Sequence, residues 1–360
     1  MISVCPNCGG RKQGLHPSTV VMVSSGKKPK KAKKVLTAFH EATMRVAERM
    51  EPQVSEAYLT AVAKYQKQID EAAIRSALAS GSQDALASAI GPSKLGSIMA
   101  NGGEMEAAMA NTIAAGGEAS AQVLEAAFGV RPTSFKAVDP VAALFAREQA
   151  GTLIVQISAE VLEAVRIVLE AAQLYGLTVA QQARAIRTIV GLPPNWAGAP
   201  LNLANEIAEG WASKATGRRL SAIDKARIRK RIREGTVDQA FIDEMMGKYT
   251  ASLLNRRALN IARTETIRSA IEGQHSLWEK GLKDGILPRS MRRMVLVTPD
   301  DRLRETHAAV PGMNVSGVKL DYPFSTPWGN RMNPPWEPLC RCGVGLIFPG
   351  FSPADLAGGE

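Results

Sequence analysis

Aromatic residues and long apolar runs are scarce in this sequence. Phe, Trp and Tyr together make up 5% of its 360 residues, so stacking of exposed bases on many aromatic rings, as in single-strand binders, is poorly supported. No apolar run approaches the roughly 20 residues that a helix needs to cross a bilayer. The N-terminus also lacks the basic-then-apolar pattern of a secretion signal. We therefore expect a soluble chain that stays in the cytoplasm where it is made, without a membrane partner.

Familiar catalytic signatures are absent as well. The sequence has no nucleophile elbow, no phosphate-binding glycine loop and no His-Glu-x-x-His helix. The pattern for ADP-ribosyl transfer is incomplete, because Ser325-Thr326 occurs without the paired glutamate motif. These absences predict that the chain is not an enzyme.

Cysteine is scarce, and its four residues form two close pairs near opposite ends of the chain. This spacing does not suggest a disulfide framework and favours metal binding by reduced thiols. Cys5 and Cys8 lie in Cys-Pro-Asn-Cys-Gly-Gly, which is one half of a zinc ribbon or knuckle. His16 is near enough in sequence to supply a third ligand. The alternative is a reduced loop without a metal.

The second cysteine pair, Cys340 and Cys342, is made of alternate residues. In an extended chain alternate side chains face the same way, so two thiolates here can clasp one metal ion. His307 is a candidate third ligand, and the N-terminal pair could join the same ion if the ends of the chain meet. A structural zinc ion would also stabilise a C-terminal region that is rich in glycine and proline.

Basic residues outnumber acidic ones, and the formal net charge is +10. This charge predicts attraction to a polyanion such as nucleic acid, an acidic protein face or anionic lipid. With few aromatic residues, contacts to backbone phosphates are the expected mode of nucleic-acid binding. The candidates lie in a lysine block and in a basic helix: Lys27, Lys28, Lys30, Lys31, Lys33, Lys34, Arg229, Lys230, Arg231 and Arg233. A solvated linker and arginines paired with helix neighbours are the respective alternatives.

Apolar residues recur at steps of three and four along most of the chain, which predicts a mainly α-helical fold. Two amphipathic helices are expected between residues 32 and 80, with a break near Pro52. Glycines between residues 81 and 135 predict short helical pieces. Asp139-Pro140 begins a long helix whose apolar stripe suggests packing in a bundle or against another copy, and Thr178 caps the next helix.

The C-terminal region is expected to form a small α+β domain. Met294 to Val297 and Val344 to Phe348 are short apolar runs typical of strands. The predicted organisation is a Cys-x-x-Cys segment with a basic flexible arm (1–34), an alanine-rich helical region (35–192), a linker (193–200), the C-terminal domain (201–350) and a tail (351–360).

Three motifs occupy the last third of the chain. The first is Arg263-Thr264-Glu265 on a predicted helix, where Arg263 is expected to bond groups of the domain that follows. The second comprises Asp301, Arg304 and His307, spaced by three along a brief helix that is expected to start near Thr298. The third is Cys340-Arg341-Cys342.

The order and chemistry of these motifs resemble the phage head morphogenesis family, the minor head proteins similar to protein F of phage Mu. One departure is that Glu337-Pro338-Leu339 precedes the cysteine pair, where family members often carry a small or polar residue.

The resemblance implies a head-morphogenesis-like C-terminal domain in a structural minor head (capsid) protein of a tailed phage. Such a protein would be bound near the portal inside the head and would assist head assembly and DNA packaging or delivery. Its partners would be the portal protein, capsid or scaffold proteins, packaged double-stranded DNA and further copies of itself. Its location would be the virion, with the host cytoplasm during assembly. The residues leave two alternatives, a zinc-dependent enzyme and a stand-alone nucleic-acid-binding protein.

Overall fold

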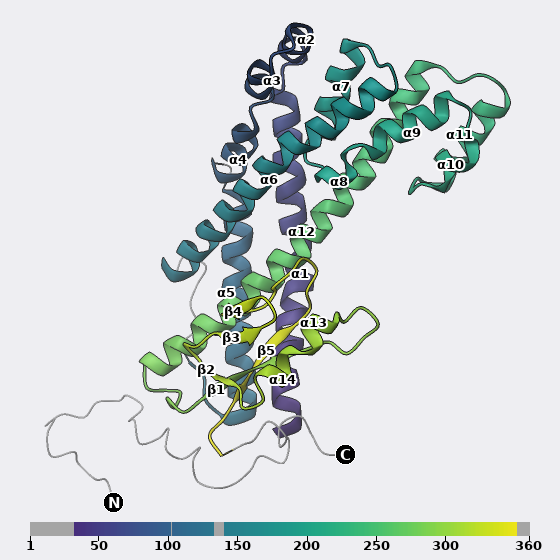
Figure 1. Ribbon diagram of the computed structural model, residues 1–360. Coiled ribbons are helices and arrows are strands. Elements are labelled where there is room, and N and C mark those ends of the chain that lie inside the picture. Colours follow the sequence, from purple (N-terminus) through teal and green to yellow (C-terminus); the bar gives the residue numbers. More distant parts are fainter. Residues whose placement is uncertain (1–31, 102, 133–139, 351–360) are drawn as a thin grey trace, which may run out of the picture.

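The computed structural model describes residues 32–101, 103–132 and 140–350 (Figure 1). The fold is mainly helical, with a few short antiparallel strands near the C-terminus, and this confirms the predicted fold class. Within the described residues, no helix is long and apolar enough to span a membrane.

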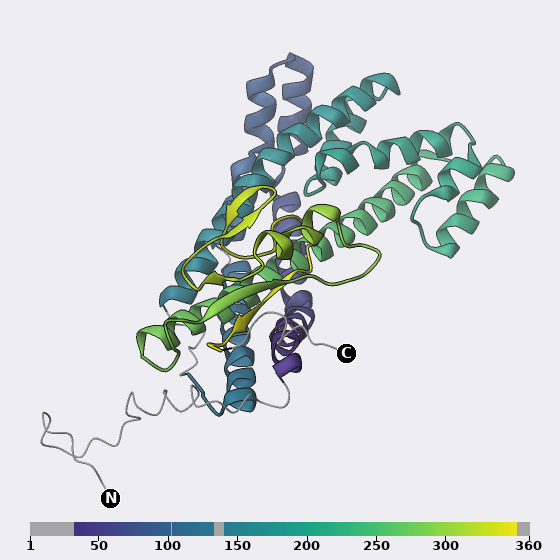
Figure 2. The ribbon, with the colours of Figure 1, turned by 60° about the horizontal axis from the view of Figure 1, so that its bottom comes forward.

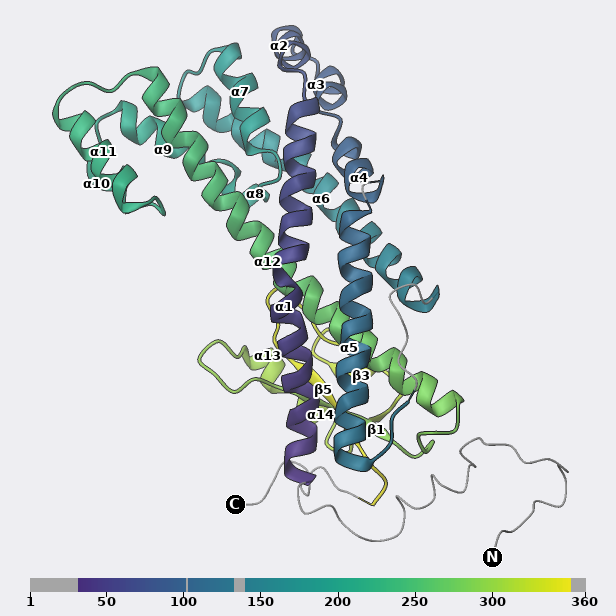
Figure 3. The same ribbon diagram turned by 180° about the vertical axis from the view of Figure 1, so that it is seen from behind.

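Three long helices form the centre of the molecule: α1 (Ala32–Gln68), α5 (Glu104–Phe128) and α12 (Gln239–Lys283). They pack against one another, and Figure 3 shows α1 and α5 side by side with α12 crossing behind them. At the crossing of α5 and α12, a Cβ atom on Gly116 would collide with the backbone of Ala270, and one on Gly273 with the carbonyl group of Ile113. The two backbones therefore touch where glycine leaves room for them.

The short helices expected between glycines are confirmed for α3, which Gly91 ends, and for α4. The same expectation is wrong at Gly116, which lies inside the 25-residue α5 and serves close packing. The expected break at Pro52 is also wrong. Pro52 lies inside α1, which continues through it. An interior proline costs about 3 kcal/mol, but Val54, Tyr58 and Tyr65 follow it and are fully buried. Burial of each such side chain stabilises by about 1.5–3 kcal/mol, so packing offsets the cost of the proline.

Further helices lie mainly around one end of this centre, and of these α6 is also long, with 35 residues. They are α2 (Glu71–Ser80), α3 (Gln83–Ile90), α4 (Pro92–Asn101), α6 (Pro140–Leu174), α7 (Val179–Ile189), α8 (Pro194–Ala197), α9 (Ala199–Ala208), α10 (Ala212–Gly217) and α11 (Ala222–Arg233). The predicted helix starts at Pro140 and after Thr178 are confirmed, the latter by a capping box between Thr178 and Gln181. The expected linker at 193–200 is corrected, because these residues form α8 and the start of α9, with Ala197 and Pro200 buried.

The hydrophobic core consists of two main clusters, and the long helices α1, α5 and α12 each contribute to both. The boundary between the clusters therefore does not fall at the expected linker in the sequence. One cluster joins the second half of α1 to α2–α11 and the first part of α12. The other joins the start of α1, the end of α5 and the end of α12 to the strands. Residues 201–350 therefore contribute to both clusters. The arm expected at 1–34 also ends earlier than predicted, since α1 begins at Ala32 and contains Lys33 and Lys34.

The strands form a small unit against α1 and the end of α12 (Figure 2). β1 (Arg292–Leu296) lies between β2 (Val318–Lys319) and β5 (Gly343–Ile347) in an antiparallel sheet, with Val295 opposite Val344. β3 (Phe324–Thr326) and β4 (Gly329–Arg331) form a hairpin, and α13 (Glu305–Ala308) and α14 (Val310–Met313) lie in the connection between β1 and β2. The two predicted strands are confirmed, with ends shifted by one or two residues.

Candidate metal centre

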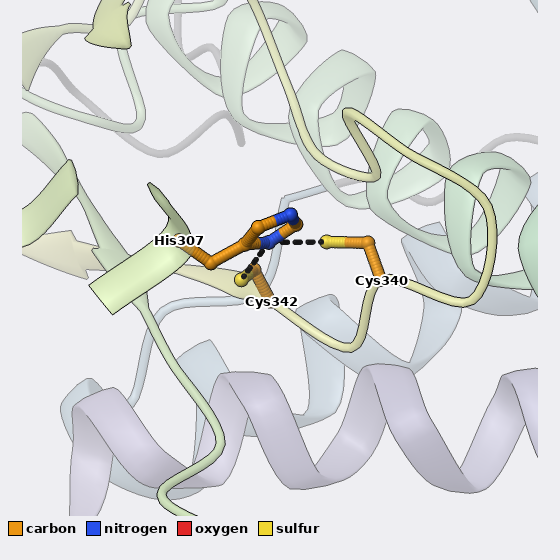
Figure 4. A group of neighbouring side chains, drawn as sticks. All are labelled: His307, Cys340 and Cys342. Carbon is orange, nitrogen blue, oxygen red and sulfur yellow. Dashed lines mark hydrogen bonds between the residues drawn. The ribbon is translucent and has the colours of Figure 1, made fainter. Parts of the chain in front are cut away.

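His307, Cys340 and Cys342 form one buried cluster (Figure 4). The side chains come from α13 and from the segment that leads into β5, and each residue is at most 3% exposed. Nδ1 of His307 lies 3.4 Å from the sulfur of Cys340 and 3.4 Å from that of Cys342. The three potential ligand atoms all lie within 4.8 Å of one another. This cluster could therefore hold a metal ion.

The carboxylate of Glu337 fixes the orientation of the imidazole. Nε2 of His307 lies 2.9 Å from Oε2 of Glu337, and because a carboxylate only accepts, Nε2 carries the proton. Nδ1 is then left with a free lone pair directed at the two sulfurs, which is the tautomer that a metal ligand needs. Arg304, at the N-cap of α13, donates to the same oxygen of Glu337 (3.2 Å) and to the carbonyl of Pro338 (3.0 Å). A carboxylate behind a metal-binding histidine typically strengthens that ligand.

The segment before the cysteines is tied to α12. The backbone N–H of Leu339 donates to the hydroxyl of Thr264 at 3.0 Å, and that hydroxyl donates in turn to the carbonyl of Asn260 at 2.9 Å. Leu339 has a φ of +62°, which is uncommon for a residue with a side chain. The departure at Glu337-Pro338-Leu339 thus has a structural use, since Glu337 bonds His307 and Leu339 turns the chain toward Thr264.

The pKa values of the two thiols are shifted in opposite directions. A hydrogen bond from Cys342 lowers the pKa of Cys340 to about 6, although burial opposes this shift. The same bond, together with burial, raises the pKa of Cys342. One sulfur is therefore a ready thiolate, and a metal ion would displace the remaining proton from the other.

Two tryptophans enclose the imidazole. The ring of His307 lies 5.1 Å from that of Trp328 and 5.9 Å from that of Trp336, and the two indoles lie 6.1 Å apart. Trp336 is half-buried, and its Nε1 atom has no hydrogen-bond partner within the described residues. These rings exclude water from one side of the cluster and add apolar contacts to a small unit.

A pocket of about 170 Å³ borders the other side of the cluster, and all three candidate ligands line it. Its wall also contains Thr298 and a set of arginines: Arg263, Arg302, Arg304 and Arg341. Several of these arginines have acidic partners. Arg263 lies 3.3 Å from Glu51, and Arg341 pairs closely with Asp300. The walls of the pocket are therefore positively charged groups that are largely neutralised by neighbours.

The structure brings most of the three motifs together. The pocket beside the cluster is lined by Arg263, Arg304 and Arg341. Thr264 bonds the segment just before the cysteines, so residues far apart in sequence meet here. The prediction that Asp301 lies on one helix with Arg304 and His307 is wrong. The brief helix starts at Glu305 and not near Thr298, and the side chain of Asp301 is 90% exposed.

Of two further motif residues, Glu265 faces away from the cluster, and Arg263 lines the pocket beside it but bonds another helix. Glu265 is buried in a pair with Arg268 on its own helix, at 2.9 Å, and burial raises the pKa of its carboxyl. Arg263 bonds Glu51 of α1, so its expected partner in the C-terminal domain is also corrected.

Other site residues were missed from the sequence. Glu337, Asp300 and the two tryptophans had no spacing that could distinguish them from ordinary loop residues, except that Glu337 lies three positions before Cys340. Conversely, Cys5, Cys8, His16 and the four lysines Lys27, Lys28, Lys30 and Lys31 lie outside the described residues.

The donor set fits a metal ion of the zinc type. Two thiolates and one imidazole are ligands that zinc prefers, and here they are buried, oriented and backed by a carboxylate. Comparisons of the chain with protein-family models, with curated proteins and with solved structures found no match.

Proposed function

We propose that this chain is a structural minor head protein of a tailed phage, and that a structural zinc ion held by His307, Cys340 and Cys342 stabilises its C-terminal unit. The observation that carries the proposal is the convergence of three sequence motifs on one buried cluster. The same motifs carry the resemblance to the head morphogenesis proteins. The convergence of the three motifs supports a shared structural role for them.

The surroundings of the cluster favour a structural ion. Strands of two to five residues give the C-terminal unit little core of its own, and such units gain much of their stability from a metal. Glu337 is the carboxylate nearest to the histidine, but it is engaged by both His307 and Arg304 and is not free to act as a general base. A stabilising role therefore fits these contacts better than catalysis.

The shape of the molecule suits a docking component. α12 has 45 residues and at 1.5 Å per residue is about 68 Å long. The strands lie along the second half of this shaft, and α10 and α11 lie beside its start (Figure 1). A rigid shaft with a distinct module at each end can contact two different parts of an assembly. In the proposed role, the C-terminal unit contacts the portal protein, inside the head, with capsid or scaffold proteins as further partners.

Two measurements test the proposal. Elemental analysis of the purified full chain is expected to find about one zinc per chain, reduced in the variants His307→Ala and Cys342→Ser. A pull-down with portal protein should retain the chain after nuclease digestion of DNA. Loss of the chain on digestion would instead indicate a stand-alone nucleic-acid-binding protein.

A zinc-dependent enzyme is the second candidate, because the described residues supply three ligands and a pocket borders them. Catalytic zinc sites keep one coordination position open in this way. A hydrolytic activity that copurifies with the zinc-loaded chain and disappears in His307→Ala would favour it over the structural role.

A further inference from the structure

The most basic part of the described chain is the pair of helices α10 and α11, at the end of α12 that is remote from the strands (Figures 1 and 2). Residues 212–235 contain nine basic and two acidic residues, so they carry a net charge of nine minus two, or +7, of the +10 of the whole chain. The question is which of these cations hold the two helices in place and which face outward.

One group of cations holds the helices in place. Arg218 makes a two-pronged bond with Glu206 of α9, at 2.8 and 2.6 Å. Arg227 does the same with Glu244 of α12, at 2.6 and 2.9 Å. Arg231 donates to the carbonyl of Thr236 at 2.7 Å, and its guanidinium lies over the ring of Phe241. These arginines are committed to the fold, so Arg231 leaves the set of nucleic-acid-binding candidates.

A second group lies on the opposite side of α11. Lys225, Arg229 and Arg233 follow one another at steps of four, and Lys230 lies beside them. At about 100° per residue, these four positions fall within an arc of about 140°, which excludes Arg227 and Arg231. Arg229, Lys230 and Arg233 are exposed, and none of the four has an ion-pair partner in the part of the chain that the structure describes. Lys225 is half-buried.

We propose that this outer face of α11, made of Lys225, Arg229, Lys230 and Arg233, binds the phosphate backbone of duplex DNA. Lys225 and Arg233 are eight residues apart, or about 12 Å along the helix. Over that length a duplex presents about seven negative charges. The face thus offers a row of uncompensated cations on the scale of the phosphate spacing.

The composition of the face favours DNA over an acidic protein. Protein interfaces have an apolar or aromatic centre and are depleted in lysine, whereas protein–DNA interfaces are strongly positive and polar. The four residues of this face include no apolar anchor and no aromatic ring on which a base could stack. Binding through phosphates alone is independent of sequence. The inference goes beyond the proposed head-protein function, because the surface would act in the same way wherever the chain meets DNA.

The test uses the full chain and a fluorescein-labelled 30-base-pair duplex, with fluorescence anisotropy measured across a series of NaCl concentrations. In the triple variant Arg229→Gln, Lys230→Gln, Arg233→Gln, the slope of log K against log salt is expected to fall by about 2.7, from 0.9 per lost contact. The matched control is Lys67→Gln, Arg75→Gln, Lys94→Gln, which removes three exposed cations and the same net charge elsewhere. Its slope is expected to change little.

An equal decrease of the salt slope in the two triple variants would overturn the inference, because net charge alone would then explain binding. An unchanged slope in the α11 variant would also overturn it and would place binding on other cations, such as the N-terminal lysines. Because these side chains have no ion-pair partner among the described residues, folding should persist in the variant, and circular dichroism verifies this. The single variant Lys230→Gln, with an expected slope change of about 0.9, gives an independent reading.

Discussion

Replacement of Cys340 by serine tests the metal centre most directly. The change removes one of three ligands from a cluster in which every residue is at most 3% exposed, and the serine hydroxyl is a poor zinc ligand. A ligand present at 1,000 times its Kd stabilises the folded state by about 4 kcal/mol. At roughly 2–4 °C per kcal/mol for units of 150–250 residues, the variant should melt about 8 °C or more below the wild type in the presence of zinc.

The assay separates the metal from ordinary packing. Thermal unfolding is followed by circular dichroism in zinc and in EDTA. On addition of EDTA the melting temperature of the wild type should fall most of the way to that of the variant. The melting temperature of Cys340→Ser should change little, because the variant has no complete metal site. Asp301→Asn serves as the control, since that side chain is exposed and should leave the melt unchanged in both solutions. If EDTA leaves the wild-type melt unchanged, or if Cys340→Ser is equally destabilised with and without zinc, the structural metal is refuted.

Three further outcomes are expected from the fold. Gly273→Ala should destabilise by about 1–3 kcal/mol or more through overpacking against the carbonyl of Ile113, whereas Gly247→Ala, in open space on the same helix, should be neutral or stabilising in chemical denaturation. Arg293→Met should destabilise by about 1–3 kcal/mol in the same assay, because the buried Arg293 donates to the carbonyls of Tyr322 and Met332, which then lose their donor. Burial lowers the pKa of His275 below 6.5, so the unfolded state binds the proton more readily and stability is lost as the pH falls through 6.5. Between pH 6.5 and 5.5 the wild type should lose up to about 1 kcal/mol more than His275→Gln, and equal losses would contradict the assignment.

The sequence anticipated the helices because their determinants are local. Periodic apolar residues, the capping Thr178 and Asp139-Pro140 each act within a few residues, and the structure has helices at these places. The same local reasoning failed at Pro52, where an unfavourable residue is tolerated because α1 is packed along its length. It also failed at 193–200, where prolines and glycine start helices against the core instead of linking two domains.

The candidate site was anticipated in its chemistry but not in its contacts. The types and spacing of His307, Cys340 and Cys342 were enough to suggest a shared ion, and the structure places their ligand atoms together. Nothing in the sequence indicated that Asp300, and not Asp301, would pair with Arg341. Which of two adjacent acids faces inward depends on where a loop turns, and that turn is set by the elements on either side.

The sequence by itself determined the helical character of the chain, two of its strands and the chemical class of its candidate metal ligands, because these follow from side-chain type and from short-range periodicity. Only the tertiary structure decided that α12 runs through two cores, that Glu337 orients His307 and that Thr264 holds the segment before the cysteines. These relations join residues that are 30 to 75 positions apart. They depend on the angle and depth at which helices cross, and the close approach at Gly116 and Gly273 shows how such a crossing is fixed by two distant small residues acting together.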